Sequence, residues 1–206
     1  MMSTRKQLAA GAAAALLALF AASCQRDGEG AAPAIDAAAP AKPAASLASF
    51  KTGEFKELDL DQDLSLPTSS FLDADGKPRT MTEFQGKVVV LNIWAEWCAP
   101  CVEEMPTLAA LQKAFPGEEV IVAPVAFGYP DAFDSAKARL AKLVGADLPF
   151  FYDSKYDVSA DAHSGAFPST IIYGKDGKEV ARLMLPADWS SEQAKGLVQA
   201  VLDGAS

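Results

Sequence analysis

Two continuous hydrophobic runs dominate the pattern in the middle of the chain. Residues 88–95 (VVVLNIWA) and 119–128 (EVIVAPVAFG) are mostly hydrophobic at successive positions, with many β-branched residues. Such runs indicate strands that are buried on both faces of a sheet. Between them, hydrophobic residues recur at helical spacing after Cys98, which predicts a helix of about 15 residues that ends at 115–117 (FPG).

The flanking segments predict the rest of the fold. Residues 71–81 (FLDADGKPRTM) indicate a hairpin, because an Asp75-Gly76 turn separates two short runs. Later elements are an amphipathic helix, a short strand with a helical turn, two strands joined at Asp-Gly and a last helix (131–145, 149–160, 169–185 and 188–202). Ser190 and Gln193 suggest a capping box for the last helix. This order predicts an α/β fold, with a central mixed sheet, helices on both faces and an N-terminal β-hairpin extension.

The start of the chain has the pattern of a secretory signal. Arg5 and Lys6 precede residues 8–22 (LAAGAAAALLALFAA), which are 15 uncharged residues. This run is shorter than the about 20 residues that a membrane-spanning helix needs. It leads into AASC, which resembles a bacterial lipobox ending at Cys24, although Ala21 stands where leucine is usual. We expect Cys24 to be lipidated, and an uncleaved N-terminal anchor is the alternative.

Composition divides the chain into three parts. Residues 1–23 are the expected signal peptide or anchor, residues 24–57 are rich in Ala, Pro, Ser and Gly, and residues 58–206 form one ordinary domain. The middle part has few large hydrophobic residues and no helical or strand period, so burial cannot offset the entropy of ordering it. We predict that it is a flexible tether.

The charge balance narrows the classes of partner. The chain has 18 Lys and Arg residues, of which two lie in residues 1–23, and 27 Asp and Glu residues, so the part after residue 23 has a net charge of −11. Because nucleic acids and anionic lipid surfaces are also negatively charged, neither is expected as a partner.

The segment WAEWCAPC contains Cys98 and Cys101, two of the three cysteines. A zinc site would need four ligands, and beyond this pair the chain offers only Cys24 and His163 among cysteines and histidines. A purely structural disulfide is also disfavoured, because closing so short a loop gains little chain entropy. We therefore predict no metal site at these cysteines.

A redox-active pair has a direct physical explanation. Cys98 follows a buried strand at the start of a helix, where backbone N–H groups and the helix dipole stabilise a thiolate. Cys101 lies one turn further on, within reach of a mixed disulfide on Cys98. Pro100 lacks an N–H and favours helical backbone near a helix start. Trp97 is expected to shield one side of the sulfur from water.

The segment VVVLNIWAEWCAPCVEEMPTL is similar to the thioredoxin-like superfamily. Within it, the pattern W-C-x-P-C-x-x-E-x-P resembles the membrane-anchored, extracytoplasmic TlpA/ResA-type oxidoreductases. The similarity covers residues 66–206, and LPADWSSEQAKGLV near the end is similar to the TlpA proteins themselves. The resemblance implies a thioredoxin fold and dithiol–disulfide exchange, with no cofactor beyond the redox-active disulfide Cys98–Cys101.

The resemblance also implies roles for individual residues. Cys98 would be the exposed attacking thiol and Cys101 the resolving thiol. Phe167-Pro168 matches the segment that carries the family's cis-proline, which packs against the disulfide. That proline leaves no N–H facing the sulfurs, and the backbone beside it can pair with an extended client segment.

An acidic residue near the thiols is expected to carry a proton. Glu104 matches the family's active-site glutamate, whereas Glu103 is expected to be a solvated helix residue. Asn92 stands where ordinary thioredoxins keep a buried aspartate, so Glu104 is the preferred proton carrier for Cys101. Two residues depart from the branch: Glu96, where Ser or Thr is more usual, and the bulky Phe167, which predicts a narrower client groove.

Two other functions remain open from the sequence. A peroxiredoxin-like peroxidase shares the fold, but it needs a Thr-containing turn before its cysteine, where this chain has NIWAEW. A copper-binding assembly factor would use C-x-x-x-C-P and a distant histidine, and here the cysteine spacing is one residue shorter. His163 is less favoured as a catalytic base, because a lone loop histidine is more often simply solvated.

The resemblance implies particular partners. Clients would be proteins with CxxC or CxxxC disulfides, in cytochrome oxidase copper-site assembly or cytochrome c maturation. The electron donor would be a membrane thiol shuttle. We expect a periplasmic, membrane-anchored monomer that reduces the disulfides of such clients.

Overall fold

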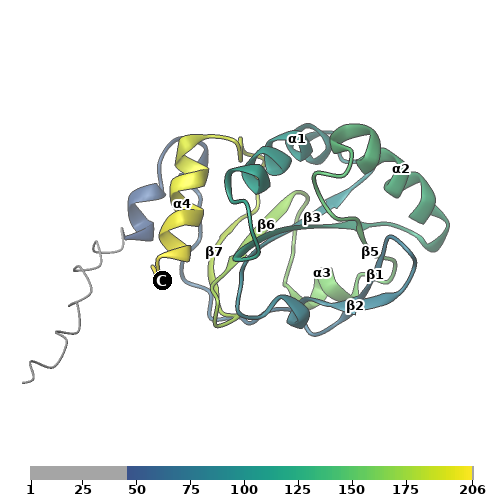
Figure 1. Ribbon diagram of the computed structural model, residues 1–206, viewed down its shortest axis with the longest axis horizontal. Helices are drawn as coiled ribbons and strands as arrows, with labels where there is room; N and C mark the ends of the chain where they lie inside the picture. Colours follow the sequence, from purple (N-terminus) through teal and green to yellow (C-terminus); the bar gives the residue numbers. More distant parts are fainter. Residues whose placement is uncertain (1–45, 206) are drawn as a thin grey trace, which may run out of the picture. The chain divides into compact units, whose positions relative to one another are not determined.

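The computed structural model describes residues 46–205 (Figure 1). One mixed sheet of seven strands has the order β2-β1-β5-β4-β3-β6-β7. The strands are β1 Ser70–Asp73, β2 Pro78–Thr80, β3 Val88–Ala95, β4 Val120–Phe127, β5 Phe151–Asp153, β6 Ser169–Tyr173 and β7 Glu179–Leu183. β4 runs parallel to both β3 and β5, and the other neighbours are antiparallel. The predicted mixed sheet and its N-terminal hairpin are therefore confirmed.

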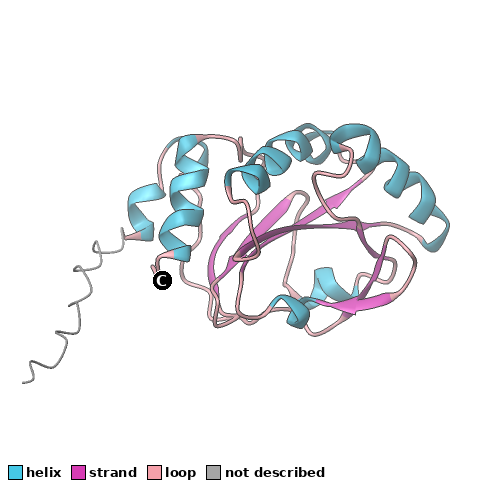
Figure 2. Ribbon diagram, viewed as in Figure 1, coloured by secondary structure: helices cyan, strands magenta, loops and turns pink. Residues whose placement is uncertain are grey.

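Helices cover both faces of the sheet (Figure 2). They are α1 Ala99–Ala114, α2 Phe133–Val144, α3 Asp157–Asp161 and α4 Glu192–Leu202, with short 3-10 turns η1 Leu47–Phe50, η2 Gly53–Phe55, η3 Met81–Phe84 and η4 Pro130–Ala132. Alternate residues of β3 serve two core layers. Val88, Val90 and Trp94 belong to the layer under α1, α2 and α4, whereas Val89, Leu91 and Ile93 belong to the layer with α3 and the hairpin.

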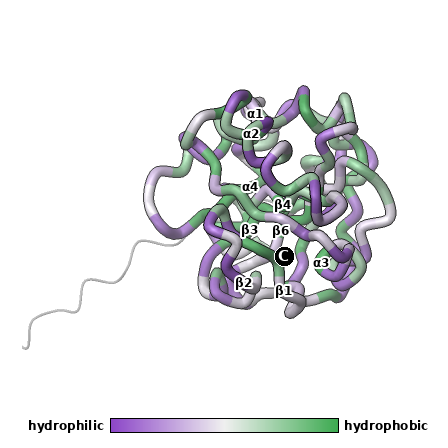
Figure 3. The backbone as a smooth tube through the Cα atoms, turned by 90° about the vertical axis from the view of Figure 1, so that its right-hand side faces the viewer, coloured by the Kyte–Doolittle hydropathy of each residue, from purple (hydrophilic) through white to green (hydrophobic). Residues whose placement is uncertain are grey.

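The central strands are buried because their side chains contribute to both layers. Every residue of β3 is buried, as its uninterrupted hydrophobic run predicted. Figure 3 shows hydrophobic segments running through the middle of the domain and hydrophilic segments mainly in the outer loops. The cysteine segment that follows β3 is thus attached to a strand whose residues are all buried.

The ordered domain begins before residue 58, which differs from the predicted tether 24–57. η1 and η2 lie within that segment, and η1 packs beside α4. Leu47 and Phe55 are buried, and the Phe55 ring meets the Trp189 ring edge-on at 5.2 Å between centroids. Together with Leu58, these are three widely spaced buried hydrophobic side chains. They are enough to order the segment because α4 already provides the surface that they cover. The expected signal 1–23 and Cys24 lie outside the described residues.

The predicted capping box of α4 is wrong by one residue. Ser191 is the N-cap, and its hydroxyl accepts a hydrogen bond from the Ala194 N–H. Ser190 instead donates its hydroxyl to Asp188, and Gln193 reaches back to the Phe50 and Thr52 carbonyls. Gln193 therefore ties the N-terminal segment to α4. Within residues 46–205, no helix is both long and hydrophobic enough to cross a membrane.

Candidate active site

The two cysteines of WAEWCAPC form a disulfide at the start of α1. Cys98 is the N-cap residue, and Cys101 lies in the first turn, with 5.3 Å between the two Cα atoms. Cys98 is 6% exposed and Cys101 is completely buried. Any partner thiol must therefore approach from the side of Cys98.

The helix start favours a negative charge on Cys98. Its sulfur accepts a hydrogen bond from the Cys101 N–H, with 3.3 Å between sulfur and nitrogen. Pro100 occupies the first turn, where a missing N–H removes no intrahelical hydrogen bond. Once the disulfide is reduced, the same N–H group and the positive end of the helix dipole stabilise a Cys98 thiolate.

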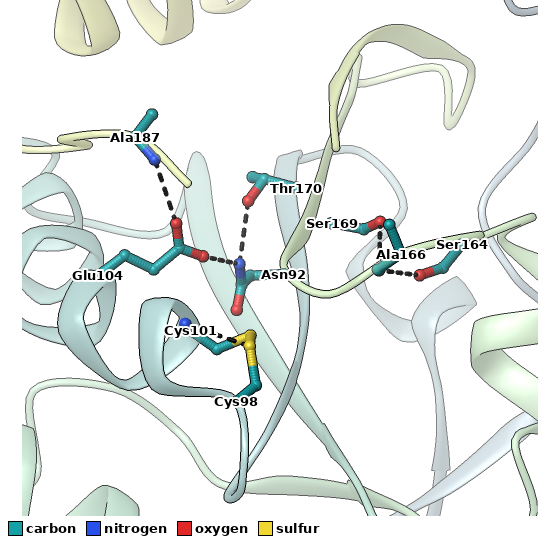
Figure 4. Close-up of a disulfide and its surroundings, with 9 residues drawn as sticks. All are labelled: Asn92, Cys98, Cys101, Glu104, Ser164, Ala166, Ser169, Thr170 and Ala187. Atoms are coloured by element: carbon teal, nitrogen blue, oxygen red, sulfur yellow. Dashed lines mark hydrogen bonds between the residues drawn. A yellow bond between two sulfur atoms is a disulfide. The ribbon is translucent and has the colours of Figure 1, made fainter. Parts of the chain in front are cut away.

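Glu104 lies on the buried face of α1, one turn beyond Cys101. It is 3% exposed, whereas the neighbouring Glu103 is exposed. One carboxylate oxygen accepts a hydrogen bond from the Asn92 side chain at 2.7 Å, and the other accepts from the Ala187 N–H at 3.4 Å. Figure 4 shows this carboxylate between the loop of Ala187 and the Asn92 amide.

Burial raises the pKa of the Glu104 carboxyl from 4.5 to about 7. The hydrogen bonds from Asn92 and Ala187 act in the opposite direction, because they stabilise the ionised form. The Trp189 indole also lowers this pKa slightly, although its N–H has no partner that meets hydrogen-bond geometry among the described residues. A carboxyl group that titrates near neutral pH can both accept and release a proton.

A cleft of about 310 Å³ reaches Glu104 from the surface. It lies between α1, η2 and the loop after β7, and its lining includes Pro100, Thr107 and Ala187 together with the acids Glu54, Glu103, Glu104 and Asp188. The cleft gives solvent a route to the carboxylate on the side away from the sheet.

The Phe167–Pro168 peptide bond is cis, at the entry to β6. The preceding turn is fixed by two serine hydroxyls, because Ser164 and Ser169 both donate hydrogen bonds to the Ala166 carbonyl (Figure 4). Pro168 is buried, whereas Phe167 is partly exposed. The turn thus presents Phe167 beside the active site on a rigid support.

Four aromatic rings form a continuous run beside the disulfide. The Trp97 ring meets Phe167 edge-on at 5.5 Å, Phe167 stacks on Phe127 at 5.7 Å, and Phe127 meets Tyr156 at 5.2 Å. Trp97 is 69% exposed, so it does not cover the sulfur as closely as expected. We call Trp97, Phe167, Phe127 and Tyr156 the aromatic run.

Other expected residues lie apart from this cluster. Glu96 accepts a hydrogen bond from the Ser135 hydroxyl at 2.7 Å, which directs its carboxylate toward α2. His163 is exposed at the end of α3, in the layer opposite Glu104, and its carbonyl accepts a hydrogen bond from Arg182. Sequence reasoning missed Thr170, Phe127 and Tyr156. Thr170 had one available signal, because it lies two residues after Pro168.

Comparisons with known proteins agree with this geometry. Residues 61–197 match the Redoxin family. The chain is 29% identical over 128 residues to the thioredoxin-like protein YneN of Bacillus subtilis, covering 62% of this chain and 74% of YneN. It is 27% identical over 137 residues to the thiol-disulfide oxidoreductase ResA of Bacillus thuringiensis, covering 66% of this chain and 75% of ResA.

Solved structures show the same fold. One is a thiol:disulfide interchange protein of the DsbE type from Chlorobium tepidum, with a TM-score of 0.60 and 20% identity, covering 70% of this chain and 99% of that one. Another is a secreted disulfide oxidoreductase of Mycobacterium tuberculosis, with a TM-score of 0.54 and 22% identity, covering 65% and 96%. The chain therefore belongs to the Redoxin family, as a thioredoxin-fold thiol–disulfide oxidoreductase of the TlpA/ResA type.

Proposed function

We propose that this oxidoreductase works as a reductase of disulfides in extracytoplasmic client proteins, with the cysteine pair itself as its redox group. The observation that carries the proposal is the asymmetry of the pair. Cys98 lies at the helix start on the accessible side, whereas Cys101 is buried one turn away from a glutamate whose pKa is about 7. This arrangement suits an attacking thiolate and a resolving thiol that needs a base.

The proposed reaction has two exchange steps. The Cys98 thiolate attacks the client disulfide, forms a mixed disulfide, and releases one client sulfur as a thiolate that takes a proton from solvent. Cys101 then gives its proton to Glu104 and attacks Cys98, which restores the Cys98–Cys101 disulfide and releases the second client sulfur. Two electrons pass to the client, and a dithiol donor such as a membrane thiol shuttle must reduce the enzyme again.

The aromatic run supports a protein client. A peptide that brings its sulfur to Cys98 also meets Trp97 and Phe167, and exposed aromatic rings bind hydrophobic side chains beside the reacting cysteine. We propose that the backbone next to Pro168 pairs with an extended client segment. We propose clients with CxxC or CxxxC disulfides, in copper-site assembly of cytochrome oxidase or in cytochrome c maturation.

We further propose a periplasmic location with an N-terminal membrane anchor. The support is the signal-like segment 1–23 and the lipobox-like Cys24. The secreted relative from Mycobacterium tuberculosis is consistent with an extracytoplasmic site of action. The charge of the chain gives no reason for nucleic-acid binding, and we propose that the protein acts as a monomer.

The proposed function is tested with the reduced chain and a synthetic peptide that contains a CxxxC disulfide. We expect stoichiometric peptide reduction and formation of the Cys98–Cys101 disulfide, measured by mass spectrometry after alkylation. A redox titration should give a potential on the order of −270 mV or somewhat less negative. Rapid peroxide consumption, or tight Cu(I) binding without peptide reduction, would instead support the peroxidase or the copper-binding assembly factor.

A further inference from the structure

Asn92 is a fully buried polar residue for which the reaction above gives no role. It shares a face of β3 with Val90 and Trp94, so its side chain lies in the layer under α1. Both hydrogens of its amide are used: the nitrogen donates to Glu104 at 2.7 Å and to the Thr170 hydroxyl at 2.9 Å. Its oxygen is buried and has no hydrogen-bond partner within the described part of the chain.

The position of this unpaired oxygen connects it with the redox pair. Leaving a buried carbonyl oxygen without a partner costs about 1–3 kcal/mol. In Figure 4 the Asn92 oxygen lies on the side of the amide that faces Cys98 and Cys101, away from Glu104. The disulfide has no hydrogen to donate. Reduction gives Cys101 an S–H group, which is the donor that the Asn92 oxygen lacks.

We propose that the Asn92 amide is a two-position switch that turns over when the Cys101 proton moves to Glu104. In the position seen here, the NH₂ group faces Glu104 and Thr170, and the oxygen faces the cysteines. In the turned position, the oxygen faces Glu104 and Thr170, and the NH₂ group faces the Cys101 thiolate. The inference rests on the proposed reductase function.

The hydrogen-bond chemistry of the neighbours permits both positions. An ionised Glu104 only accepts hydrogen bonds, so the NH₂ group must face it, as observed. A protonated Glu104 has an O–H donor, which requires an acceptor. The Thr170 hydroxyl fits either state, because a hydroxyl both donates and accepts. After a half-turn of the amide, its oxygen accepts from Glu104 and Thr170, and both N–H groups become available to the thiolate.

The switch acts in the second exchange step. The S–H bond of Cys101 breaks and its proton goes to the Glu104 carboxylate. The amide turns and donates to the Cys101 thiolate, which then attacks the Cys98 sulfur and breaks the bond between Cys98 and the client. The other acids around Glu104 are Glu103, Glu54 and Asp188, which line the solvent cleft. Asn92 is therefore a positioning residue between the base and the resolving sulfur.

A direct test is NMR on the full chain with the Asn92 side-chain amide assigned. In the oxidised protein at a pH above 7, we expect nuclear Overhauser contacts from the amide protons to the side chain of Thr170. In the same protein at a pH well below 7, where Glu104 is protonated and needs an acceptor, we expect these contacts to be replaced by contacts to the Cys101 β-protons. Unchanged contacts in the two states would overturn the switch.

Kinetics of two variants provide an independent test. Thr170→Val removes the hydroxyl that serves both positions, and we expect resolution of a preformed Cys98–glutathione mixed disulfide to slow about 5- to 10-fold, the loss of one hydrogen bond. Thr170→Ser keeps the hydroxyl and should stay within about 2-fold of the wild type. Attack of Cys98 on oxidised glutathione should be unchanged in both variants.

The outcomes separate this inference from the proposed function. If Thr170→Val slows attack and resolution equally, the hydroxyl supports the fold and the switch is wrong. If wild-type protein reduces the CxxxC peptide but shows neither the NMR change nor the effect on resolution, the reductase function stands and only the switch fails. If wild-type protein does not reduce the peptide, the proposed function fails first.

Discussion

Glu104 on α1 and Asn92 on β3 are joined by a 2.7 Å hydrogen bond between two buried side chains, twelve residues apart. A carboxylate in such a site is normally unfavourable, because burial removes its hydration. The bond holds the carboxyl group in place one helical turn beyond the resolving cysteine, while burial raises its pKa to about 7. The position of the base is thus determined by contact between helix and sheet.

Replacing Glu104 by Gln should slow resolution without preventing folding. Proton transfer by a placed side chain is typically worth roughly 10²–10⁴-fold. In the wild type, resolution of a Cys98 mixed disulfide should accelerate as the pH rises through about 7, because the base must be ionised. Stopped-flow measurements on Glu104→Gln should show a slower rate without this step. The exposed Glu103→Gln is the matched control, and an unchanged pH profile in Glu104→Gln would exclude Glu104 as the base.

The same carboxyl group should make stability depend on pH. Its folded pKa of about 7 lies above the ordinary 4.5, so the folded state keeps its proton to higher pH. The free energy of unfolding should therefore fall as pH rises between these two values, by roughly 3 kcal/mol in total. Below pH 4.5 the carboxyl group is protonated in both the folded and the unfolded state, so the full stability is retained and does not change with pH. Denaturant titrations of oxidised wild type and Glu104→Gln should differ by this slope, and parallel curves would contradict the raised pKa.

The two cysteines should have different roles, with Cys98 attacking the client and Cys101 resolving the mixed disulfide. Cys101→Ser should accumulate mixed disulfides between Cys98 and client proteins in cells, because the resolving thiol is missing. Cys98→Ser should accumulate none, since Cys101 is completely buried. Non-reducing gels and mass spectrometry would detect and identify the adducts, which reductant should release. Trapping by Cys98→Ser alone would reverse the assignment.

Trp97 should contribute more to the binding of protein clients than to the binding of small disulfides. Its ring is exposed and heads the aromatic run, and aromatic contacts are worth about 0.5–1.5 kcal/mol each. Trp97→Ala should therefore raise KM for a CxxxC peptide about 2- to 12-fold, with little change for oxidised glutathione. Tyr129→Ala, an exposed aromatic outside the run, is the control. Equal effects on both substrates would show that Trp97 acts on the cysteines and not on the client.

The N-terminal segment that contains Phe55 should stabilise the folded domain. Phe55 is 1% exposed and packs against Trp189, which follows the loop that holds Glu104. Phe55→Ala should lower the free energy of unfolding by about 3–5 kcal/mol, as for other buried phenylalanines. The exposed Lys51→Ala should change it by less than about 0.5 kcal/mol. A small effect of Phe55→Ala in urea titrations would show that this segment is a tether that does not stabilise the domain.

Most helices and strands were predictable because hydrophobic runs and turn residues depend only on short stretches of sequence. The run at 88–95 coincides with β3, and the Asp75-Gly76 turn joins β1 to β2. The start of α4 was misplaced because Ser190 and Ser191 are both suitable caps, and the choice depends on Asp188, which engages the Ser190 hydroxyl. The few hydrophobic residues at 47–55 have no period, so their burial against the rest of the domain has no local signal.

The amino-acid sequence was enough to predict the cysteine pair and its place between a buried strand and a helix. It also favoured Glu104 over Glu103, because Glu104 matches the family's active-site glutamate and Asn92 replaces the usual buried aspartate. The surroundings of that glutamate depend instead on how distant segments pack together. Asn92 and Thr170 come from β3 and β6, and Ala187 from the loop after β7, so their distances to Glu104 depend on strand order and helix docking. No periodicity encodes those contacts, because hydrogen bonds between distant segments arise only once the layers have packed.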